Sequence, residues 1–407
     1  MAKRDDHISE KARSVVSIKE KETIDISDLH EFNQAAIKLA LDHCIKCNTC
    51  KYAFGPFTPS CPSGEKFLWE SYWASGRIRI ARGILTEKLE INNEVIEPIF
   101  ACITCGSCQD QCQATHQDRI VDIFEALREL VVKRIGAPER HKALSTRITE
   151  NNNPYGEVNS NNADLKKKHE LPDEAEIAYF IGCTSNYRQQ HLRDSTISVF
   201  KKLGIDFTLI DEYCCGSPII RTGQTDPVDS LIQHNMEEFR RAGCKTIVTS
   251  CAGCYRTLKK DFPKFDESFD YTVIHTLDLI ASKLKSDDMR SFEKRATYHD
   301  PCHLGHHLGW YDVPRQVISK IPGLEFEEMD QNRQYSWCCG AGGGVKIGYP
   351  DFALETAEKR IGHAENKKAD VLLSTCPFCK TNLSDAAKSR ESRVQVLDII
   401  EVLDEIL

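Results

Sequence analysis

From residue 177 to the end of the chain, short apolar runs alternate with longer stretches in which apolar residues recur every three or four positions. The short runs are typical of buried β-strands, and the longer stretches of helices that cover a sheet. Strands are predicted at 177–181, 207–210 and 246–249, with helices at 184–203 and 227–241 between them. This alternation predicts an α/β lobe with a parallel sheet.

The same order of elements occurs a second time. Strands are predicted at 296–299, 324–329 and 371–373, and the closing apolar segments 273–277 and 394–398 also correspond to each other. We therefore expect one supersecondary unit that is present twice. The first lobe occupies residues 176–290 and the second occupies residues 291–407.

The first third of the chain carries helical patterns instead. Apolar residues at helical spacing predict a helix that begins near residues 27–28, and further helices over 65–74, 78–85 and 119–134. The segment boundaries that we expect are a flexible arm at 1–27, a helical domain at 28–148 and a linker rich in Asn, Ser and Lys at 149–175. The predicted fold class is α+β and multidomain, with an all-helical domain followed by two repeated α/β lobes.

Composition and charge exclude several classes of protein. A hydrophobic share of 41% and a charged share of 28% are those of a globular protein, and the net charge of -8 argues against a nucleic-acid binder. No run of 18 apolar residues occurs, and the first 31 residues are charged throughout. We expect no transmembrane helix, no direct membrane insertion, no signal peptide and a cytoplasmic location.

The chain contains nineteen cysteines, and eighteen of them fall into tight groups. In an intracellular chain of this length, such groups indicate metal ligation rather than a disulfide framework. The remaining cysteine, Cys244, stands alone before a predicted strand, and we expect it to be structural, because free cysteine often packs as a small hydrophobe.

Two groups lie in the predicted helical domain and have the spacing of bacterial ferredoxins. Three cysteines at intervals of three, with a fourth further on, bind a [4Fe-4S] cluster in that pattern, and the fourth cysteine ligates the other cluster. By this rule one cluster is bound by Cys44, Cys47, Cys50 and Cys112, and the other by Cys102, Cys105, Cys108 and Cys61. Ten residues separate Cys50 from Cys61 where three are usual, and Gln113 stands where proline is usual, so the pairing is less firmly predicted than the clusters. Paired four-cysteine zinc sites are the alternative, but zinc favours two separated Cys-x-x-Cys pairs.

Each predicted lobe carries five cysteines in one arrangement: a single cysteine, an adjacent pair followed by glycine, and a Cys-x-x-Cys pair. Zinc takes four ligands, so a multinuclear iron-sulfur cluster suits five thiolates better, while a vicinal disulfide remains an alternative. The glycines after Cys339 would allow close backbone approach and leave amide donors free for cluster sulfur. The two sets are Cys183, Cys214, Cys215, Cys251 and Cys254 in the first lobe and Cys302, Cys338, Cys339, Cys376 and Cys379 in the second.

These ten cysteines resemble the two cysteine-rich CCG domains of heterodisulfide reductases. With two [4Fe-4S] groups on the same chain, residues 30–407 resemble the D-type subunits of these enzymes, which fuse a ferredoxin-like part to the catalytic part. The helical domain is similar to the ferredoxin module of succinate dehydrogenase iron-sulfur subunits. The resemblance implies two noncubane iron-sulfur clusters, one per CCG lobe, beside two [4Fe-4S] clusters. It also implies that the mixed disulfide of coenzyme M and coenzyme B, the disulfide of methanogenesis, is reduced between the two lobes.

Reduction of a disulfide to two thiols needs two electrons and two protons. Each noncubane cluster could bind one departing sulfur, while the two [4Fe-4S] clusters bring electrons. His303 directly follows Cys302 and is the candidate proton donor, with a structural histidine as the alternative. An anionic disulfide would also favour nearby cations. Those in or beside ligand loops are Arg188, Arg221, Arg256 and Lys380, although a solvated surface is the simpler expectation for each.

The chain has no nucleotide or flavin fingerprint, so electrons would come from a partner subunit of the cytochrome b type or a flavoprotein. Any peripheral attachment to a membrane would go through that partner. The alternative function is an electron-transfer role in a glycolate, lactate or glycerol-3-phosphate dehydrogenase complex, because iron-sulfur subunits there share this domain order. Such subunits often retain incomplete ligand sets, whereas both sets are complete here.

Overall fold

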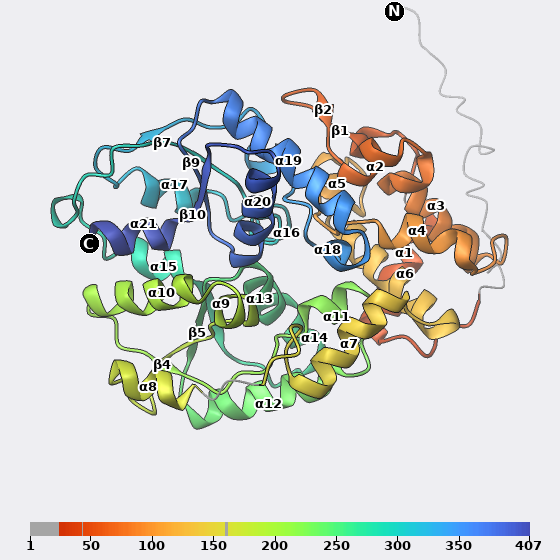
Figure 1. Cartoon of the computed structure of the whole chain (residues 1–407). Coiled ribbons are helices and arrows are strands. Elements are labelled where there is room, and N and C mark those ends of the chain that lie inside the picture. Colours follow the sequence, from red (N-terminus) through yellow and green to blue (C-terminus); the bar gives the residue numbers. More distant parts are fainter. Residues whose placement is uncertain (1–23, 43, 159–161) are drawn as a thin grey trace, which may run out of the picture.

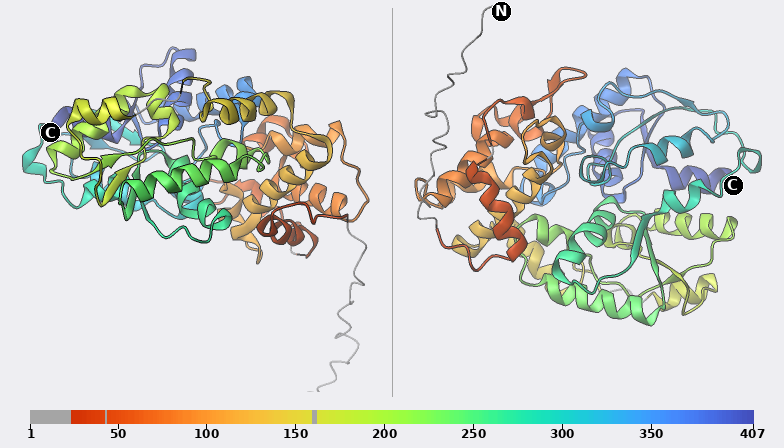
Figure 2. Two further views of the ribbon diagram at one scale, coloured as in Figure 1. Left: turned by 90° about the horizontal axis from the view of Figure 1, so that it is seen from below. Right: turned by 180° about the vertical axis from the view of Figure 1, so that it is seen from behind.

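The computed structural model describes residues 24–42, 44–158 and 162–407. A helical part lies at one side of the molecule, and two α/β lobes lie side by side against it (Figures 1 and 2). The predicted fold class is therefore confirmed. Most of the predicted flexible arm, residues 1–27, falls outside the described residues.

The helical part is built around the packing of α1 (Glu31–Asp42) against α6 (Ile120–Ile135). Apolar residues of α1 and α6, such as Ile37 and Leu127, are fully buried in one core. Polar contacts lock the same pair, because Asn33 donates a 2.6 Å hydrogen bond to Glu129. The remaining helices are α2 (Pro62–Phe67), α3 (Ala74–Leu85), α4 (Asn93–Phe100), α5 (Ser107–Gln111) and α7 (Glu139–Asn151), with short turns η2 (Thr49–Lys51), η3 (Glu70–Tyr72) and η4 (Gln117–Arg119) and a hairpin of β1 (Tyr52–Ala53) and β2 (Thr58–Pro59).

One predicted helix, over 65–74, is wrong. α2 ends at Phe67 because Leu68 takes a left-handed conformation, with φ of 67°, and its N–H caps Gly64. The chain then turns through η3, so that the carbonyl of Tyr72 accepts a hydrogen bond from the buried Arg77. The helical periodicity of the sequence does not show that a buried guanidinium needs this carbonyl as a hydrogen-bond acceptor.

The first lobe contains a four-stranded parallel sheet in the order β4-β3-β5-β6. Its strands are β3 (Ile177–Tyr179), β4 (Thr208–Leu209), β5 (Thr246–Thr249) and β6 (Thr272–His275). Its helices are α9 (Cys183–Tyr187), α10 (Gln190–Lys202), α11 (Ser217–Arg221), α12 (Val228–Arg241), α13 (Ala252–Arg256), α14 (Phe262–Phe265) and α15 (Thr276–Ala281), with a π-helical turn η5 (Thr257–Asp261) and the 3-10 turn η6 (Ser286–Asp288).

The second lobe repeats this plan, with strands in the order β8-β7-β9-β10. Even the capping boxes correspond, because His275 begins α15 as Asp398 begins α21. The strands are β7 (Arg295–Tyr298), β8 (Glu325–Phe326), β9 (Val371–Ser374) and β10 (Gln395–Asp398), and the helices are α16 (Gly305–Leu308), α17 (Asp312–Ile318), α18 (Val345–Gly348), α19 (Pro350–Asn366), α20 (Pro377–Ser389) and α21 (Ile399–Ile406), with the turn η7 (Arg333–Tyr335).

The two lobes share one apolar core. Tyr179 and Val248 of the first sheet belong to the same buried cluster as Tyr298 and Leu373 of the second. The segment predicted as a linker, 149–175, also packs on the first lobe: it contains α8 (Ala163–His169), and the buried Asn162 donates to the carbonyl of Ile210. The lobes are therefore held in a fixed relation to each other.

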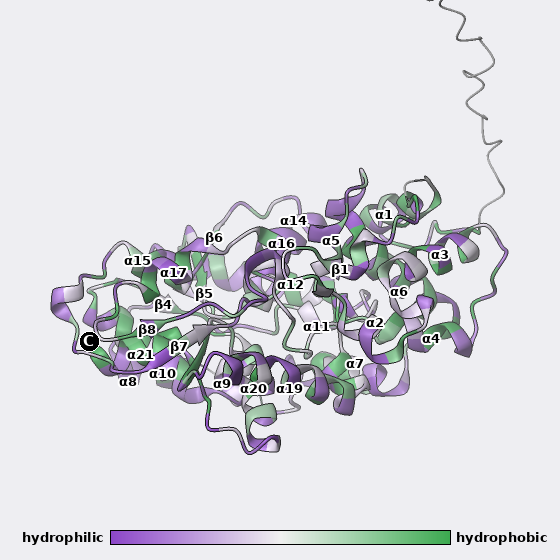
Figure 3. Ribbon diagram, turned by 90° about the horizontal axis from the view of Figure 1, so that it is seen from above, coloured by the Kyte–Doolittle hydropathy of each residue, from purple (hydrophilic) through white to green (hydrophobic). Residues whose placement is uncertain are grey.

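The helices carry hydrophilic as well as hydrophobic residues along their length, as Figure 3 shows for α19 and α20. Within the described ranges, no helix is both long and apolar enough to cross a bilayer.

A single buried arginine joins all three parts of the molecule. Arg128 on α6 is fully buried, and its guanidinium donates to the carbonyls of Ile99, Phe100 and Cys102 in the helical part. The same group donates to Arg221 of the first lobe at 2.6 Å and to Gly343 of the second at 2.8 Å. Burial lowers the pKa of Arg128 to about 10, so the group remains charged at neutral pH.

Replacing Arg128 by methionine should destabilise the protein by about 3 kcal/mol or more, because several buried carbonyls lose a charged donor at once. The expected result is a lower thermal unfolding midpoint than that of Arg82→Met, which removes an exposed guanidinium from α3. Equal midpoints for the two variants would contradict the joining role of Arg128.

Candidate functional site

The cysteines of the helical part fall into two neighbouring sets. Burial raises the pKa of Cys112, and the charges of Cys47 and Cys44 add to the rise. Burial likewise raises the pKa of Cys61, where Cys102 and Cys105 contribute in the same direction. The structure thus brings Cys112 to the first set and Cys61 to the second, which is the arrangement that the ferredoxin rule predicts. The role of these thiols as cluster ligands stays a prediction.

The two sets adjoin each other, and the second adjoins the second lobe. Burial raises the pKa of Cys50, and the charges of both Cys61 and Cys112 add to the rise. The pKa of Cys105 is lowered to about 6, chiefly by a hydrogen bond from Cys338 of the second lobe. The loop around Cys105 is held by two histidines that the sequence analysis left without a role: His306 Nδ1 lies 3.0 Å from the carbonyl of Cys105, and His307 Nε2 lies 2.9 Å from that of Thr104.

In each lobe the five cysteines lie just beyond the carboxyl ends of the strands, where parallel sheets place their sites. Three sulfur–sulfur distances are short: 3.8 Å for Cys183 and Cys214, 4.0 Å for Cys302 and Cys338, and 3.4 Å for Cys339 and Cys379. Cys215 and Cys254 also interact through their thiols. The structure therefore brings together each predicted five-cysteine set.

The two sets face each other across one cavity of about 480 Å³. A thiol interaction between Cys251 and Cys376 links the first lobe to the second directly. Cysteines from both sets line this cavity: Cys183, Cys215, Cys251 and Cys254 from the first lobe, and Cys302, Cys339, Cys376 and Cys379 from the second. A small molecule in the cavity would contact both sets at once.

His303, the predicted proton donor, lies on the wall of the cavity, and its role stays a prediction. Burial lowers its pKa to about 4, and the nearby charge of Arg221 acts in the same direction. Its Nε2 has no hydrogen-bond partner among the described residues, and its ring lies 4.6 Å from that of His307. The imidazole is therefore neutral at pH 7 and has one nitrogen free.

The expectation of a solvated surface is wrong for three of the four cations near the ligand loops. Arg221 and Arg256 are buried in ion pairs with Glu125 of α6 and with Asp261, and burial raises the pKa of Asp261 to about 7. Lys380 is buried against Glu401 at 2.5 Å. Only Arg188 lies near the surface, paired with Glu157.

Arg221 also lines the cavity, as do two cations that the sequence analysis missed, Arg147 of α7 and Lys346 of α18. Arg147 donates to the carbonyl of Pro154, and Lys346 pairs with Asp385 at 2.7 Å. Arg147 lies in a helix far from any cysteine in the sequence, so spacing could not reveal it. Lys346 stands two residues after the glycine run, and that proximity is a signal that could have found it.

The glycine run after Cys339 is needed for close packing as well as for the predicted metal site. Gly343 has a φ of 61°, and a Cβ there would lie 2.6 Å from the carbonyl of Cys102. A Cβ at Gly342 would lie 2.8 Å from the carbonyl of Ile103. Glycine is needed here because the second lobe touches the cysteine loop of the helical part.

The residues fit iron-sulfur clusters. The donors are thiols, they are mostly buried, and ten of them form two sets of five, which exceeds the four ligands of a zinc site. The amide N–H of Gly340 lies 3.4 Å from the sulfur of Cys338, a contact typical of cluster-binding loops. Cys244 takes no part: its thiol donates to the carbonyl of Phe239 at 3.5 Å.

Comparison with known proteins gives two family matches. The model of the 4Fe-4S dicluster domain matches residues 40–115, and that of the cysteine-rich CCG domain matches residues 177–259 and 296–384. A dihydromethanophenazine:CoB–CoM heterodisulfide reductase subunit of the D type, from Methanosarcina barkeri, is 37% identical over 398 residues, which cover 92% of this chain and 96% of that protein. The chain belongs to this family of heterodisulfide reductase subunits.

Other relatives share part of the arrangement. A fumarate reductase (CoM/CoB) subunit from Methanothermobacter marburgensis is 33% identical, over 76% of this chain and 62% of that protein. An EtfAB:quinone oxidoreductase from Syntrophomonas wolfei is 26% identical, over 96% of this chain and 61% of that protein. Membership in the heterodisulfide reductase family makes the chain an iron-sulfur oxidoreductase that works with partner subunits.

Cys61→Ser and Cys112→Ser should each remove a different [4Fe-4S] cluster, because their thiols lie in different sets. The iron content should fall by about four atoms per chain in each variant. In the reduced protein, each variant should lack a different EPR signal. Cys244→Ser is the matched control and should keep its iron. Loss of the same signal in both variants would contradict the assignment.

Proposed function

We propose that the chain is the disulfide-reducing subunit of a CoB–CoM heterodisulfide reductase. The observation that carries this proposal is the cavity of about 480 Å³ whose walls hold cysteines from both five-cysteine sets. A disulfide in this cavity would present one sulfur to each lobe. The names of the Methanosarcina relatives supply the substrate, the mixed disulfide of coenzyme M and coenzyme B.

The reaction consumes two electrons and two protons and releases two thiols. The iron-sulfur clusters supply the electrons singly when they are bound. The proposed complement is two [4Fe-4S] clusters in the helical part and one noncubane cluster per CCG lobe, held by Cys183, Cys214, Cys215, Cys251 and Cys254 and by Cys302, Cys338, Cys339, Cys376 and Cys379. The proximity of Cys50 in the first set to Cys61 in the second, and the thiol interaction between Cys105 and Cys338, support an electron path that enters the second lobe.

The protein side chains bind the disulfide and protonate the departing thiolates. Arg147 and Lys346 offer positive charge at the cavity, which suits anionic groups at the ends of a disulfide. His303 is the proposed proton donor. Because the imidazole is neutral at pH 7, it would first take up a proton from solvent. The resulting imidazolium, with a pKa of about 4, is a stronger acid than a thiol, whose pKa is about 8.5, so transfer of that proton to a departing thiolate is favourable.

The electron-donating partner would bind beside the first [4Fe-4S] cluster. Cys47 is the one exposed cysteine among the nineteen, and exposed apolar side chains gather in the same stretch of chain. An exposed apolar surface next to a redox centre favours a protein partner, whether of the cytochrome b type or a flavoprotein. These exposed residues, here called the entry face, are Ile45, Tyr52, Phe54, Phe57, Leu68 and Trp69.

A second candidate function is electron transfer to quinone without disulfide chemistry. Its support is the similarity to the EtfAB:quinone oxidoreductase over 96% of the chain. Against it stand two complete cysteine sets that face one cavity. The two functions differ in whether a thiol changes the cluster of a lobe.

Incubating the oxidised protein with coenzyme M, and separately with coenzyme B, should produce a thiol-dependent paramagnetic EPR signal. Cys339→Ser should abolish the signal of the second lobe and leave both [4Fe-4S] signals in place. If neither thiol changes the spectrum of the intact protein, the reductase proposal fails and the electron-transfer function is favoured.

Replacing Phe57 and Trp69 together by serine should weaken binding of the electron-donating partner at least tenfold, because both side chains are about three-quarters exposed on the entry face. The binding can be measured by titrating the donor protein. The matched control is Ile135→Ser, which removes an exposed apolar side chain at the end of α6. Equal donor binding in the two variants would contradict this placement. Liposome binding that depends on the same two residues would assign the face to a membrane instead.

A further inference from the structure

The two lobes have the same arrangement of cysteines, but the residues next to these cysteines differ. Three positions before the first cysteine of each set stands Phe180 in the first lobe and His299 in the second. Phe180 is fully buried and packs against Phe239. His299 is also fully buried, at the end of β7, but a buried imidazole needs polar partners.

One partner of His299 is an arginine that the first lobe lacks. Arg360 on α19 is fully buried, and its Nε donates a 3.2 Å hydrogen bond to His299 Nδ1. The rest of its guanidinium donates to the carbonyl of Gln331 at 2.7 Å. At the equivalent place on α12 stands Asn235, whose side chain instead accepts the backbone N–H of Tyr213.

This contact assigns the tautomer of His299. A guanidinium has only donors, so Nδ1 must offer its lone pair to Arg360. In a neutral imidazole the hydrogen then lies on the other nitrogen, Nε2. Arg360 therefore makes His299 a donor at Nε2 and removes the lone pair that a metal ligand would need there.

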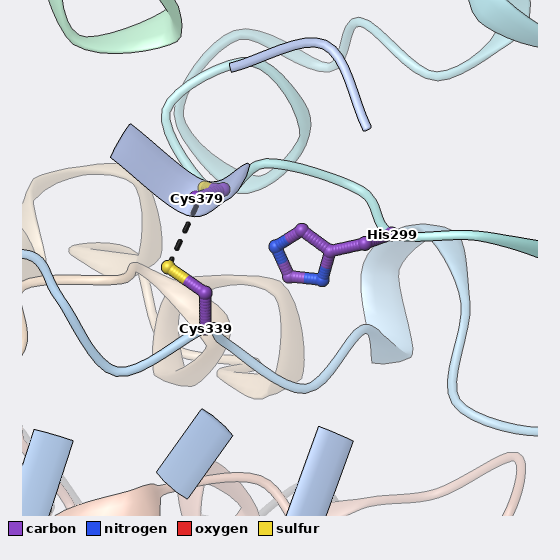
Figure 4. Close-up of side chains that lie close together, drawn as sticks. All are labelled: His299, Cys339 and Cys379. Carbon is purple, nitrogen blue, oxygen red and sulfur yellow. Dashed lines mark hydrogen bonds between the residues drawn. The ribbon is translucent and has the colours of Figure 1, made fainter. Parts of the chain in front are cut away.

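The second nitrogen of His299 faces the cluster ligands. In Figure 4 the ring points this nitrogen toward Cys339 and Cys379, and the ligand atoms of the three residues all lie within 4.8 Å of one another. Nε2 has no other hydrogen-bond partner among the described residues. A buried N–H with nothing else to bind is thus directed at the sulfurs of Cys339 and Cys379.

We propose that His299 donates a hydrogen bond from Nε2 to sulfur in the second-lobe cluster site, and that Arg360 fixes it in this role. Hydrogen bonds to cluster sulfur stabilise the more negative, reduced state and raise the reduction potential. Phe180 offers no such donor to the first lobe. Two sites with the same ligands therefore differ in potential, and the higher one is beside Cys105, where electrons arrive. The proposal rests on the proposed function only in assigning a cluster to each lobe.

The test is a redox titration of the whole protein, followed by EPR and optical spectroscopy without disulfide substrate. His299→Phe, which copies the first lobe, should lower the potential of the second-lobe cluster by about 59 mV or more, equal to a tenfold change in its one-electron equilibrium. His299→Gln keeps an N–H donor and should restore at least half of the shift. His363→Phe is the control, because His363 is partly buried on α19 of the same lobe and the charged groups that act on it are Arg360, Lys359 and Asp330.

An unchanged potential in His299→Phe with full iron content would overturn the proposal. Loss of the cluster in both variants would also overturn it, because His299 would then be a ligand. A second measurement leaves His299 unchanged: the hyperfine coupling between histidine nitrogen and the second-lobe cluster in ¹⁵N-histidine-labelled protein. The His303→Asn variant is used because it removes the imidazole next to Cys302. A weak coupling supports the hydrogen bond, whereas a strong coupling of a bound nitrogen, or none, overturns it. Because no reading depends on turnover, failure of the reductase proposal would be seen separately.

Discussion

The arrangement of this molecule depends on one buried guanidinium. Arg128 reaches carbonyls in the helical part and in both lobes, and these carbonyls belong to the segments that carry the ligand loops, including Cys102 and Gly343. A charged group at such a junction is costly to bury, and only hydrogen bonds in several directions offset that cost. The carbonyls must therefore converge on it, which holds the cysteine loops in fixed positions. A second buried network, Arg221 and Arg256 with Glu125 and Asp261, connects the helical part to the first lobe.

Duplication of one lobe explains the architecture. The differences between the two lobes explain why the proposed electron path favours one of them. Both sheets have the same strand order and both lobes place five cysteines at the carboxyl ends of the strands. A symmetric pair would treat the two halves of a disulfide alike. The second lobe touches the cysteine loop of the helical part through His306, His307 and the glycine run. It alone has the pair of His299 and Arg360. The proposed electron path therefore reaches the second lobe first.

Local signals in the sequence predicted most of the fold. Strand and helix periodicity located β5 and α12 within a residue, and cysteine spacing brought together both sets of the lobes. Sequence could not show what long-range packing decides. Arg221 and Lys380 look like surface residues until Glu125 and Glu401, far away in the chain, are placed beside them. Arg147 and His299 gain their significance only from the cavity and from Arg360, since neither stands in a motif.

The close contact between the glycine run and the loop of Cys102 also bears on how the protein is made. With Gly343 touching that loop and His307 holding Thr104, the second lobe covers one side of the proposed inner [4Fe-4S] site, and this lobe follows the helical part in the chain and is synthesised after it. This side of the site is open to iron and sulfide only until the second lobe packs against it. The packing therefore favours an order of maturation in which the helical part is loaded before the second lobe docks on it.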